Sequence, residues 1–419
     1  MAATHRQALG KTASWGWRWW IYFVVLLHGS QPVAAQVTLS GTVRDSLTHQ
    51  PLPFASVFLA NTTRGATTDA QGHYALPNVP AGRYELSATY LGYQLRQRLV
   101  LLGPHALVVD LAVLPAAHQL AEVVVRPNPN RAADYQRFLD LFLGTSTRAR
   151  QCRVRDPDAV RVDYVAQQRL LTASVPHALE VDNLALGYRL TFYDLDFRAD
   201  FAGPNLVTTT LSHLVFQPLP GGAARQRRWA ANRQRAYLGS QLHFLRCVYA
   251  DAAPAAGFEV QRLRRVPNRR RAAADSLLRA RQAALGIAFQ PTSVPDSMWR
   301  LLEQPRELTF LYAPLLPAPA YRQALGGRVW LRYPDLLAVT YLRAKPDANY
   351  HQLSLTLTPG REQASVLHLN QSPVAELTPQ GPPVDPLALL AEGYWAFEQM
   401  GDLLPTNYEP PLMLPERPR

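Results

Sequence analysis

Residues 37–115 constrain the fold most, because they form short alternating runs that each end at a turn residue. Runs such as 55–59 and 84–88 place every second side chain on the same side, as half-buried strands do. Each run stops at a Gly, Pro, Asn or Asp, with a spacing of about ten residues that is typical of all-β domains. The segment therefore predicts a small antiparallel β-sandwich.

The turn and aromatic residues of this segment also stand at characteristic spacings. The order Gly-x-Val-x-Asp, Pro-Leu-x-x-Ala-x-Val, Gly-x-x-Thr-Asp-x-x-Gly-x-Tyr, Gly-x-Tyr and Gly-Tyr resembles the carboxypeptidase regulatory-like domain. The matching residues are Gly41, Val43, Asp45, Pro51, Leu52, Ala55, Val57, Gly65, Thr68, Asp69, Gly72, Tyr74, Gly82, Tyr84, Gly92 and Tyr93. The resemblance implies a transthyretin-like or immunoglobulin-like sandwich of about seven strands, found in envelope proteins of Gram-negative bacteria. In peptidases this domain is an accessory part without catalytic residues.

Each of the matching residues also has a structural role of its own. Gly72 suits a hairpin turn that needs a positive φ, and Gly82 is expected to play the same part before the next strand. Tyr74 and Tyr84 are expected to place their rings in the sandwich core, with each hydroxyl reaching a partner at the rim.

We expect residues 1–35 to be a signal peptide. An apolar run at 19–27 is preceded by four basic residues, His5, Arg6, Lys11 and Arg18. The run is too short for a bilayer-spanning helix, which needs about twenty residues. Small residues at 33–35 predict cleavage before Gln36. The alternative to a cleaved signal peptide is that this segment stays on the protein as a membrane anchor. The protein is then expected in the periplasm or at the outer membrane or cell surface of a Gram-negative bacterium, with only peripheral membrane association.

The formal net charge of +12 suggests an acidic partner, but the basic residues argue against nucleic acid. Lysine occurs only at Lys11 and Lys345, so arginine supplies nearly all of the charge alongside abundant Ala, Leu and Pro. This composition is typical of a GC-rich genome, and basic charge alone is a weak indication of nucleic-acid binding. An anionic glycan or lipid head group stays open as a partner.

The chain changes character after the sandwich, which we place at 36–115. Residues 116–131 are expected to form one more strand and a Pro-rich linker, and residues 132–419 an α+β domain. Helices are predicted at 132–143, where Gly144 ends the helix, and at 226–249, 268–284 and 393–403. Strands are predicted at 160–164, 179–181, 188–192, 206–211, 257–260, 308–310, 329–331, 337–341, 353–357 and 366–369.

This second part resembles a region that follows the regulatory-like sandwich in envelope proteins of unassigned activity. The resemblance carries no reaction with it. It rests on Phe138, Leu139, Phe142, Leu143, Gly144, Asn183, Leu186, Gly187, Tyr188, Arg228, Trp229, Arg233, Tyr237, Gly239, Ser240, His243, Phe244, Leu245, Arg246, Trp395, Asp402, Leu403, Leu404 and Pro405. Cys247 departs from the pattern, in which a small apolar residue is expected.

The candidate ligand-binding residues are three arginines and one histidine. Arg228, Arg233 and Arg246 could hold a carboxylate or phosphate in a bidentate manner, with His243 beside them. The alternative is that the arginines pair with Asp and Glu at the edge of the α+β core. Ser240 and His243 share a helix face, but a Ser-His pair lacks the strained turn and the orienting acid of a nucleophilic site.

Two further kinds of site are conceivable in this sequence, a zinc site and a disulfide. His177 and Glu180 form a His-x-x-Glu pair, but no second histidine lies in a matching context, and the strand alternation turns Leu179 and Val181 inward. We therefore expect no metal, no cofactor and no catalytic residue. Cys152 and Cys247 could form a disulfide in an oxidising compartment, or remain two buried thiols.

These observations favour an exported, non-catalytic envelope protein whose β-sandwich is a binding or docking module for a glycan or an envelope protein. The alternative is a peptidase or other hydrolase with its site in the C-terminal domain.

Overall fold

The computed structural model describes residues 36–116, 129–203, 206–286, 294–351 and 362–411 of the 419-residue chain. The expected signal peptide, most of the linker at 116–131 and the strand expected at 353–357 lie outside these ranges. Within them, none of the helices combines the length and the hydrophobicity that crossing a bilayer requires.

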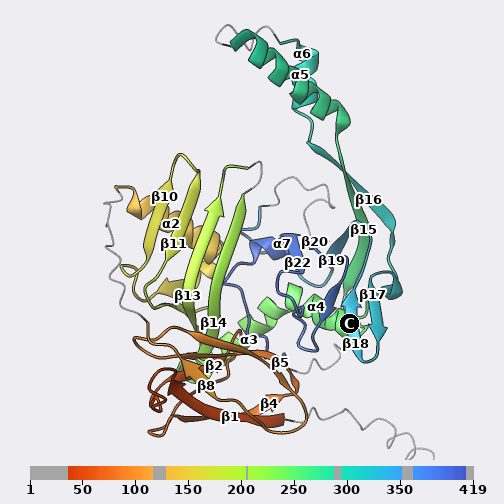
Figure 1. Ribbon diagram of the computed structural model, residues 1–419. Helices are drawn as coiled ribbons and strands as arrows, with labels where there is room; N and C mark the ends of the chain where they lie inside the picture. The colour runs from red at the N-terminus through yellow and green to blue at the C-terminus, as the bar shows by residue number, and fades with distance from the viewer. Residues whose placement is uncertain (1–35, 117–128, 204–205, 287–293, 352–361, 412–419) are drawn as a thin grey trace, which may run out of the picture.

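The N-terminal part is a sandwich of two four-stranded sheets (Figure 1). One sheet has the order β4-β1-β7, with β8 also on β1, and the other has the order β3-β2-β5-β6. Its strands are β1 (Gln36–Asp45), β2 (Ser56–Leu59), β3 (Gly65–Thr67), β4 (His73–Pro80), β5 (Gly82–Thr89), β6 (Arg96–Leu102), β7 (Leu107–Val108) and β8 (Leu111–Val113). Both β7 and β8 pair in parallel with β1, one after the other along the same side of that strand. The sandwich predicted from the sequence is therefore confirmed.

The tyrosines of the sandwich lie as predicted, whereas one glycine does not. Tyr74 and Tyr84 are buried, and their hydroxyls donate to the carbonyl oxygens of Val109 (2.6 Å) and Pro80 (3.1 Å). Gly72 has φ +76° in its turn. The turn role expected for Gly82 is wrong, because this residue begins β5 without a positive φ and a Cβ there would lie 3.0 Å from Gln380 Nε2.

A second sheet of six strands follows the sandwich, with order β10-β11-β13-β12-β9 and with β14 along the other side of β13. Its elements are α2 (Arg131–Phe142), the 3-10 helix η1 (Ala149–Gln151), β9 (Cys152–Val154), β10 (Arg161–Val165), β11 (Leu170–Ser174), β12 (Ala178–Asn183), β13 (Tyr188–Asp200) and β14 (Val207–Pro218). Helix α2 buries Phe138 and Phe142 against Phe197 and Phe192 of β13, with ring centroids 5.2 and 4.9 Å apart. Gly144 (φ +95°) ends the helix as predicted.

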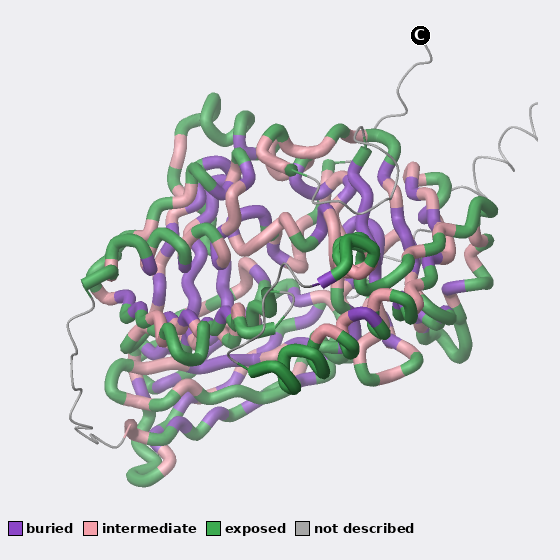
Figure 2. Tube along the Cα trace, turned by 90° about the horizontal axis from the view of Figure 1, so that it is seen from above, coloured by how far each residue is buried: buried purple, intermediate pink, exposed green. Residues whose placement is uncertain are grey.

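The remaining elements surround a five-stranded sheet of order β16-β15-β19-β20-β22 and a three-stranded sheet β17-β18-β21. They are α3 (Ala223–Tyr237), α4 (Gln241–Tyr249), β15 (Phe258–Pro267), α5 (Arg269–Leu285), α6 (Asp296–Leu302), β16 (Glu307–Leu315), η4 (Ala318–Ala320), β17 (Arg322–Leu325), β18 (Arg328–Leu331), β19 (Leu336–Tyr341), β20 (Gln363–Leu369), β21 (Ala375–Leu377), β22 (Leu389–Gly393) and α7 (Tyr394–Phe397). Helix α4 supplies Phe244 and Leu245 to the main core of this part. Buried positions follow the strands of the sheets, while loops and the outlying helices are exposed (Figure 2).

Two predicted helices differ in the structure. The single helix expected at 226–249 is broken into α3 and α4, because Gly239 adopts φ +87° and the Ser240 hydroxyl accepts a hydrogen bond from the His243 amide as the N-cap of α4. The helix expected at 393–403 is only α7, which ends at Phe397; Glu398 leaves the helix with ψ 100°.

The sandwich docks on the six-stranded sheet through the β2–β3 loop. The Asn61 amide donates to Leu214 O (2.6 Å), and the Phe216 amide donates to Thr62 O (3.0 Å). Nearby, His213 contacts Glu85 Oε1 (2.7 Å). The β2–β3 loop thus adds a short stretch of backbone pairing to the β14 edge.

Candidate functional site

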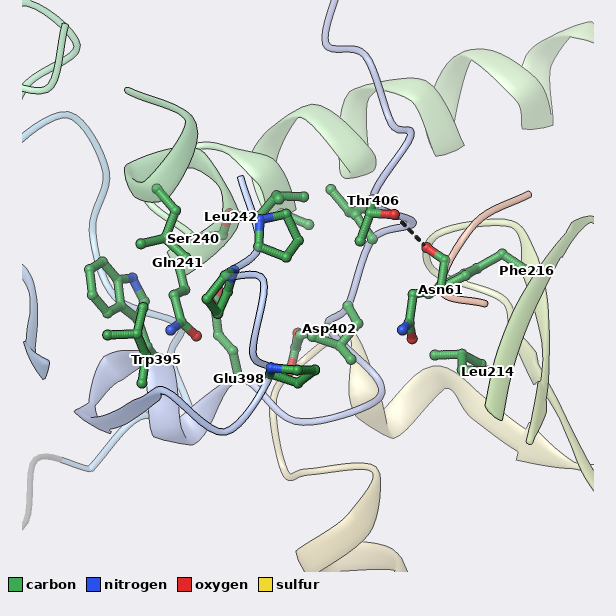
Figure 3. Close-up of a pocket in the computed structure, with 18 residues that line it drawn as sticks. Asn61, Leu214, Phe216, Ser240, Gln241, Leu242, Trp395, Glu398, Asp402 and Thr406 are labelled. Carbon is green, nitrogen blue, oxygen red and sulfur yellow. Dashed lines mark hydrogen bonds between the residues drawn. The ribbon is translucent and has the colours of Figure 1, made fainter. Parts of the chain in front are cut away.

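A cavity of about 350 Å³ lies where the sandwich, the six-stranded sheet and the C-terminal elements meet. Figure 3 shows Asn61, Leu214 and Phe216 on one side, Gln241 and Trp395 on the other, and the acidic side chains between them. Leucine and proline side chains form most of the remaining wall. The volume lies within the range of roughly 300–1,000 Å³ that is usual for small-molecule sites.

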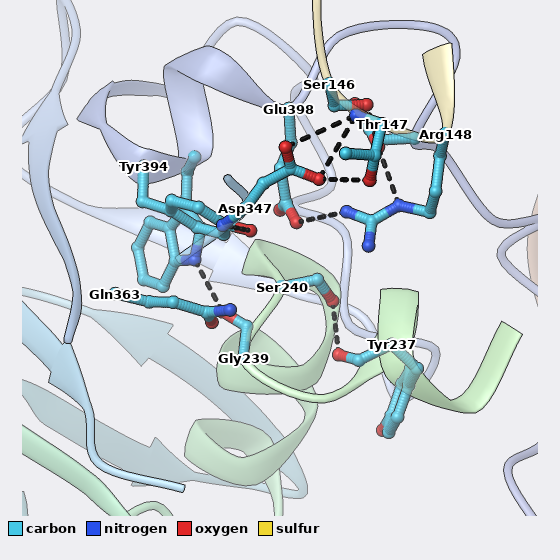
Figure 4. A network of polar contacts seen from close by, with 12 residues as sticks. Ser146, Thr147, Arg148, Tyr237, Gly239, Ser240, Asp347, Gln363, Tyr394 and Glu398 are labelled. Atoms are coloured by element: carbon cyan, nitrogen blue, oxygen red, sulfur yellow. Dashed lines mark hydrogen bonds and ion pairs between the residues drawn. The ribbon is translucent and has the colours of Figure 1, made fainter. Parts of the chain in front are cut away.

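The polar part of the cavity wall is a pair of carboxyl groups, Glu398 and Asp402, which both contact Arg148 outside the lining. Arg148 Nε donates to Asp402 Oδ1 (2.7 Å), and Arg148 Nη2 lies 3.4 Å from Glu398 Oε1. The Ser146 hydroxyl also donates to Asp402 Oδ1 (2.8 Å). Asp402 Oδ2 is buried and has no hydrogen-bond partner among the described residues. Figure 4 shows Arg148 and Glu398 facing each other in this network.

Burial changes the protonation of both carboxyl groups. It raises the pKa of Glu398 to about 8, with the neighbouring Asp402 charge as the next cause. Burial also raises the pKa of Asp402, against the opposing effects of Arg148 and Ser146. Because Asp402 holds the shorter contact to the arginine, Asp402 carries the negative charge and Glu398 keeps its proton at neutral pH.

The chain segment after α7 is held in place by the end of α2. The amides of Met400 and Gly401 donate to the carbonyl oxygens of Phe142 (3.2 Å) and Leu143 (2.9 Å). Asn183 Nδ2 donates to Gly401 O (2.8 Å). These bonds fix the two acidic side chains between the six-stranded sheet and the C-terminal elements, so the site is built from distant parts of the chain.

The rim of the cavity carries two side-chain amides. Asn61 comes from the sandwich and Gln241 from the first turn of α4, and no hydrogen bond is found for either side-chain amide among the described residues. Trp395 is already engaged, because its Nε1 donates to Gly239 O (2.8 Å). The cavity therefore offers an unpaired carboxylate oxygen, a protonated carboxyl group and two amides in apolar surroundings.

The arginines singled out in the sequence do not line this cavity. Arg228 is exposed. Arg233 donates to the carbonyl oxygens of Leu186 (2.7 Å) and Gly187 (3.0 Å), and its guanidinium lies over the Tyr188 ring. Among the described residues, Arg233 has no Asp or Glu partner, which was the alternative. The carbonyl oxygens of the loop before β13 accept its hydrogen bonds instead, so Arg233 joins α3 to that loop.

Arg246 has a similar structural role at the C-terminal segment. It donates to the carbonyl oxygens of Gln380 (2.8 Å), Tyr408 (2.7 Å) and Thr406 (2.8 Å). The ligand-binding role of the arginines stays a prediction, and these contacts give Arg246 a complete set of internal partners instead.

His243 lies beside Arg246 but inside the core. Its Nδ1 accepts a hydrogen bond from the Gly239 amide (3.1 Å), and its ring packs 4.9 Å from that of Phe258. Burial and the nearby arginines lower the pKa of His243 to about 4. The imidazole is therefore neutral at neutral pH and fixes the break between α3 and α4.

The two cysteines are free and belong to different cores. Cys152 packs at the core of the six-stranded sheet, and Cys247 packs at the core around α4. The disulfide that the sequence left open is thus not formed in the structure.

The two residues of the His-x-x-Glu pair lie at the surface and have separate surroundings. His177 is exposed, and Glu180 Oε2 lies 3.2 Å from Arg155 Nε. Leu179 and Val181 are buried, as the alternation predicts. In the part of the chain that the structure describes, no group of three or more His, Cys, Asp or Glu side chains could hold a metal ion.

Residues 39–125 match the family model of the CarboxypepD_reg-like domain, which confirms the resemblance for this segment. No curated protein is significantly similar to the chain.

Similarities to solved structures are weak. The group B streptococcus pilus 2b backbone protein is 18% identical over 20% of this chain and 42% of that chain (TM-score 0.18). A cohesin–X-dockerin complex from Acetivibrio cellulolyticus is 20% identical over 26% of this chain and 76% of that chain (TM-score 0.18). A protein of unknown function from Bacteroides fragilis is 11% identical over 87% of this chain and 97% of that chain (TM-score 0.16).

Proposed function

We propose that the protein is an exported, non-catalytic binding protein of the bacterial envelope, and that its cavity holds a neutral, polyhydroxylated ligand such as a unit of a glycan. The observation that carries this proposal is Asp402 in the wall of the cavity: its Oδ2 is buried and has no hydrogen-bond partner among the described residues. A buried polar atom left without a partner costs roughly 1–3 kcal/mol, which a donor from a ligand removes.

The charge balance of the cavity favours a neutral ligand over an ionic one. Arg148 contributes one positive charge, Asp402 with its 2.7 Å contact to Arg148 one negative charge, and Glu398 none while it keeps its proton. An ammonium or phosphate group would enter this neutral, largely apolar site as an unpaired charge, which is costly. Hydroxyl groups both donate and accept, so they match the carboxylate oxygen and the amides of Asn61 and Gln241.

The proposal is tested by binding of the purified protein to an array of neutral and anionic glycans, followed by calorimetry on the best neutral one. We expect neutral glycans to bind, and Asp402→Asn to lower affinity by roughly tenfold or more, since hydrogen bonds to charged groups contribute about 1.5–3 kcal/mol. Arg228→Ala is the matched control and should bind as the wild type does. A preference for anionic glycans, or equal binding by Asp402→Asn, would contradict the proposal.

A hydrolase is the second candidate, and one observation favours it. Glu398 keeps its proton at neutral pH and lies near a second carboxyl group in the cavity wall, and a general acid in glycoside hydrolysis also needs a carboxyl group with a raised pKa. Mass spectrometry of a bound oligosaccharide after long incubation separates the two functions. Shorter products that disappear in the Glu398→Gln variant would establish the hydrolase, whereas an intact oligosaccharide supports the binding protein.

A further inference from the structure

A two-stranded arm extends from the five-stranded sheet and carries α5 and α6 away from the body of the molecule (Figure 1). The pairing of β15 with β16 continues from Leu263↔Leu311 to Pro267↔Glu307. At the start of the tip, Asn268 Nδ2 donates to Gln304 Oε1 and to Pro305 O, both at 3.1 Å. These bonds hold the two ends of the helical tip together.

The root of the arm is also fixed. Arg265 donates through two nitrogens to the Glu392 carboxylate (2.8 and 2.6 Å), and His368 Nε2 lies 2.7 Å from the same carboxylate. This group ties β15 to β20 and β22. The arm is therefore an ordered projection, and its surface residues keep their places relative to one another.

The tip of the arm is basic. Helix α5 contains five arginines against one aspartate, Asp275, which pairs with Arg271. Among the described residues, no acidic partner is found for the remaining arginines of the tip that make no other polar contact: Arg269, Arg270, Arg281, Arg300 and Arg306. Arg270, Leu277 and Arg281 follow one another at helical spacing, so an exposed leucine lies between two unpaired charges on one stripe of α5.

Apolar side chains are exposed along the same arm. Leu308, Phe310 and Tyr312 alternate along β16 and share one face, with exposed fractions of 39%, 50% and 38%. Leu277 on α5 and Trp299 on α6 are 61% and 38% exposed. Exposed apolar side chains gathered on one projection are typical of a surface that meets a partner or a membrane.

The charge and shape of the arm favour a lipid surface over a protein. Residues 268–307 contain seven arginines against Asp275, Asp296, Glu303 and Glu307, so a second copy of the chain would meet the tip with the same net positive charge, which is unfavourable. Exposed leucine, phenylalanine, tyrosine and tryptophan on several elements around a projection can enter the boundary between headgroups and acyl chains without a shaped partner. Arginine side chains between them can pair with lipid phosphates.

We propose that this arm docks the protein on the surface of a bilayer rich in anionic phospholipid. The arginines of α5 contact the phosphates, and the apolar side chains of α5, α6 and β16 enter the interface. Each arginine near such a surface strengthens binding by roughly fivefold at physiological salt. This inference is independent of the ligand in the cavity.

Co-sedimentation of the full chain with large vesicles tests it. Vesicles that contain phosphatidylglycerol should bind the protein, vesicles of phosphatidylcholine alone should bind it much less, and added salt should weaken the binding. The double variant Arg270→Gln/Arg281→Gln should lower the partition coefficient by tenfold or more. Arg227→Gln/Arg228→Gln, on the exposed face of α3, is the matched control with the same loss of charge and should bind as the wild type does.

A third variant separates apolar contact from charge. Phe310→Ser should weaken the part of the binding that persists at high salt, while its melting temperature stays near that of the wild type because the side chain is half exposed. Equal loss in both arginine double variants, or no dependence on phosphatidylglycerol, would overturn the proposal. Binding to an acidic polypeptide such as poly-glutamate without binding to the vesicles would overturn it in favour of a protein partner.

Discussion

At the residue scale, the protonation of Glu398 decides what the cavity can hold, and the same proton affects stability. The ordinary pKa of this side chain is 4.5, and burial raises the pKa to about 8 in the folded protein. As pH rises, the unfolded chain therefore loses this proton first. Glu398 therefore lowers the free energy of unfolding progressively as pH rises from about 4.5 to about 8. Its contribution is constant above that range.

The Glu398→Gln variant tests this sign. It lacks the titrating proton, so its free energy of unfolding relative to the wild type should rise by up to about 1.4 kcal/mol per pH unit through this window. Urea unfolding at several pH values measures the difference. Glu180→Gln, at a surface pair with Arg155, is the control and should show no comparable rise. A difference for Glu398→Gln that does not change with pH would show that Glu398 is ionised in the folded protein.

The cysteines provide a second test at this scale. Burial raises the pKa of Cys152 to about 12 and that of Cys247 to about 11, so little thiolate exists at pH 8. Iodoacetamide should therefore modify neither thiol in the native protein and both in denaturant, as counted by mass spectrometry. A denatured chain that takes up no label until a reductant is added would instead reveal the disulfide.

Residue roles were only partly predictable from the sequence. Strand alternation placed Leu179 and Val181 correctly, because burial of one face follows from a period of two. Arg233 and Arg246 looked like ligand residues, since nothing in their spacing shows that backbone carbonyls lie beside them. Asp402 stood in a recognised motif with Trp395, but the partner Arg148 is distant in the chain and no local pattern connects them.

At the scale of elements, the break between α3 and α4 shows why helix boundaries were harder to predict than helix positions. Apolar residues continue at helical spacing through 226–249, so the pattern indicates one helix. Gly239 and Ser240 are the local signals of a break, a residue that tolerates positive φ followed by an N-cap. Tertiary contacts determine that the helix breaks here, because Trp395 and Gln363 pack against Gly239.

The substitution Gly239→Ala tests this junction. The new Cβ would lie 2.0 Å from Gln363 Oε1 and 2.7 Å from the Tyr341 ring, at φ +87°. We expect a loss of roughly 2–5 kcal/mol in the free energy of unfolding from the left-handed backbone and the overpacking together. Gly103→Ala, where a Cβ meets open space, should change stability by a few tenths at most. Similar melting temperatures for the two variants would contradict the geometry of the break.

At the scale of the whole molecule, three parts with separate cores contribute to one cavity, the sandwich through Asn61. The sandwich has its own core, and so do the six-stranded sheet and the elements around α4. The sequence predicted the sandwich and the α+β character of the rest, because both follow from periodicity. It did not predict that the sandwich docks on β14, although Phe58 is a large apolar residue on the face of β2 that points away from the sandwich core.

Phe58 therefore reports on docking and not on the fold of the sandwich itself. Its ring stacks on Tyr193 of the six-stranded sheet with centroids 5.0 Å apart, and the side chain is 3% exposed. In the full chain, Phe58→Ala should lower the free energy of unfolding by about 3 kcal/mol. In a fragment of residues 36–116 the same side chain faces solvent, so the substitution should have almost no effect there.

Val57→Asp, which places a charge in the sandwich core, should unfold both the fragment and the sandwich in the full chain. Urea unfolding of the unchanged sequence and the two variants, each as fragment and as full chain, measures these differences, and an equal loss from Phe58→Ala in fragment and full chain would show that the ring stabilises the sandwich alone.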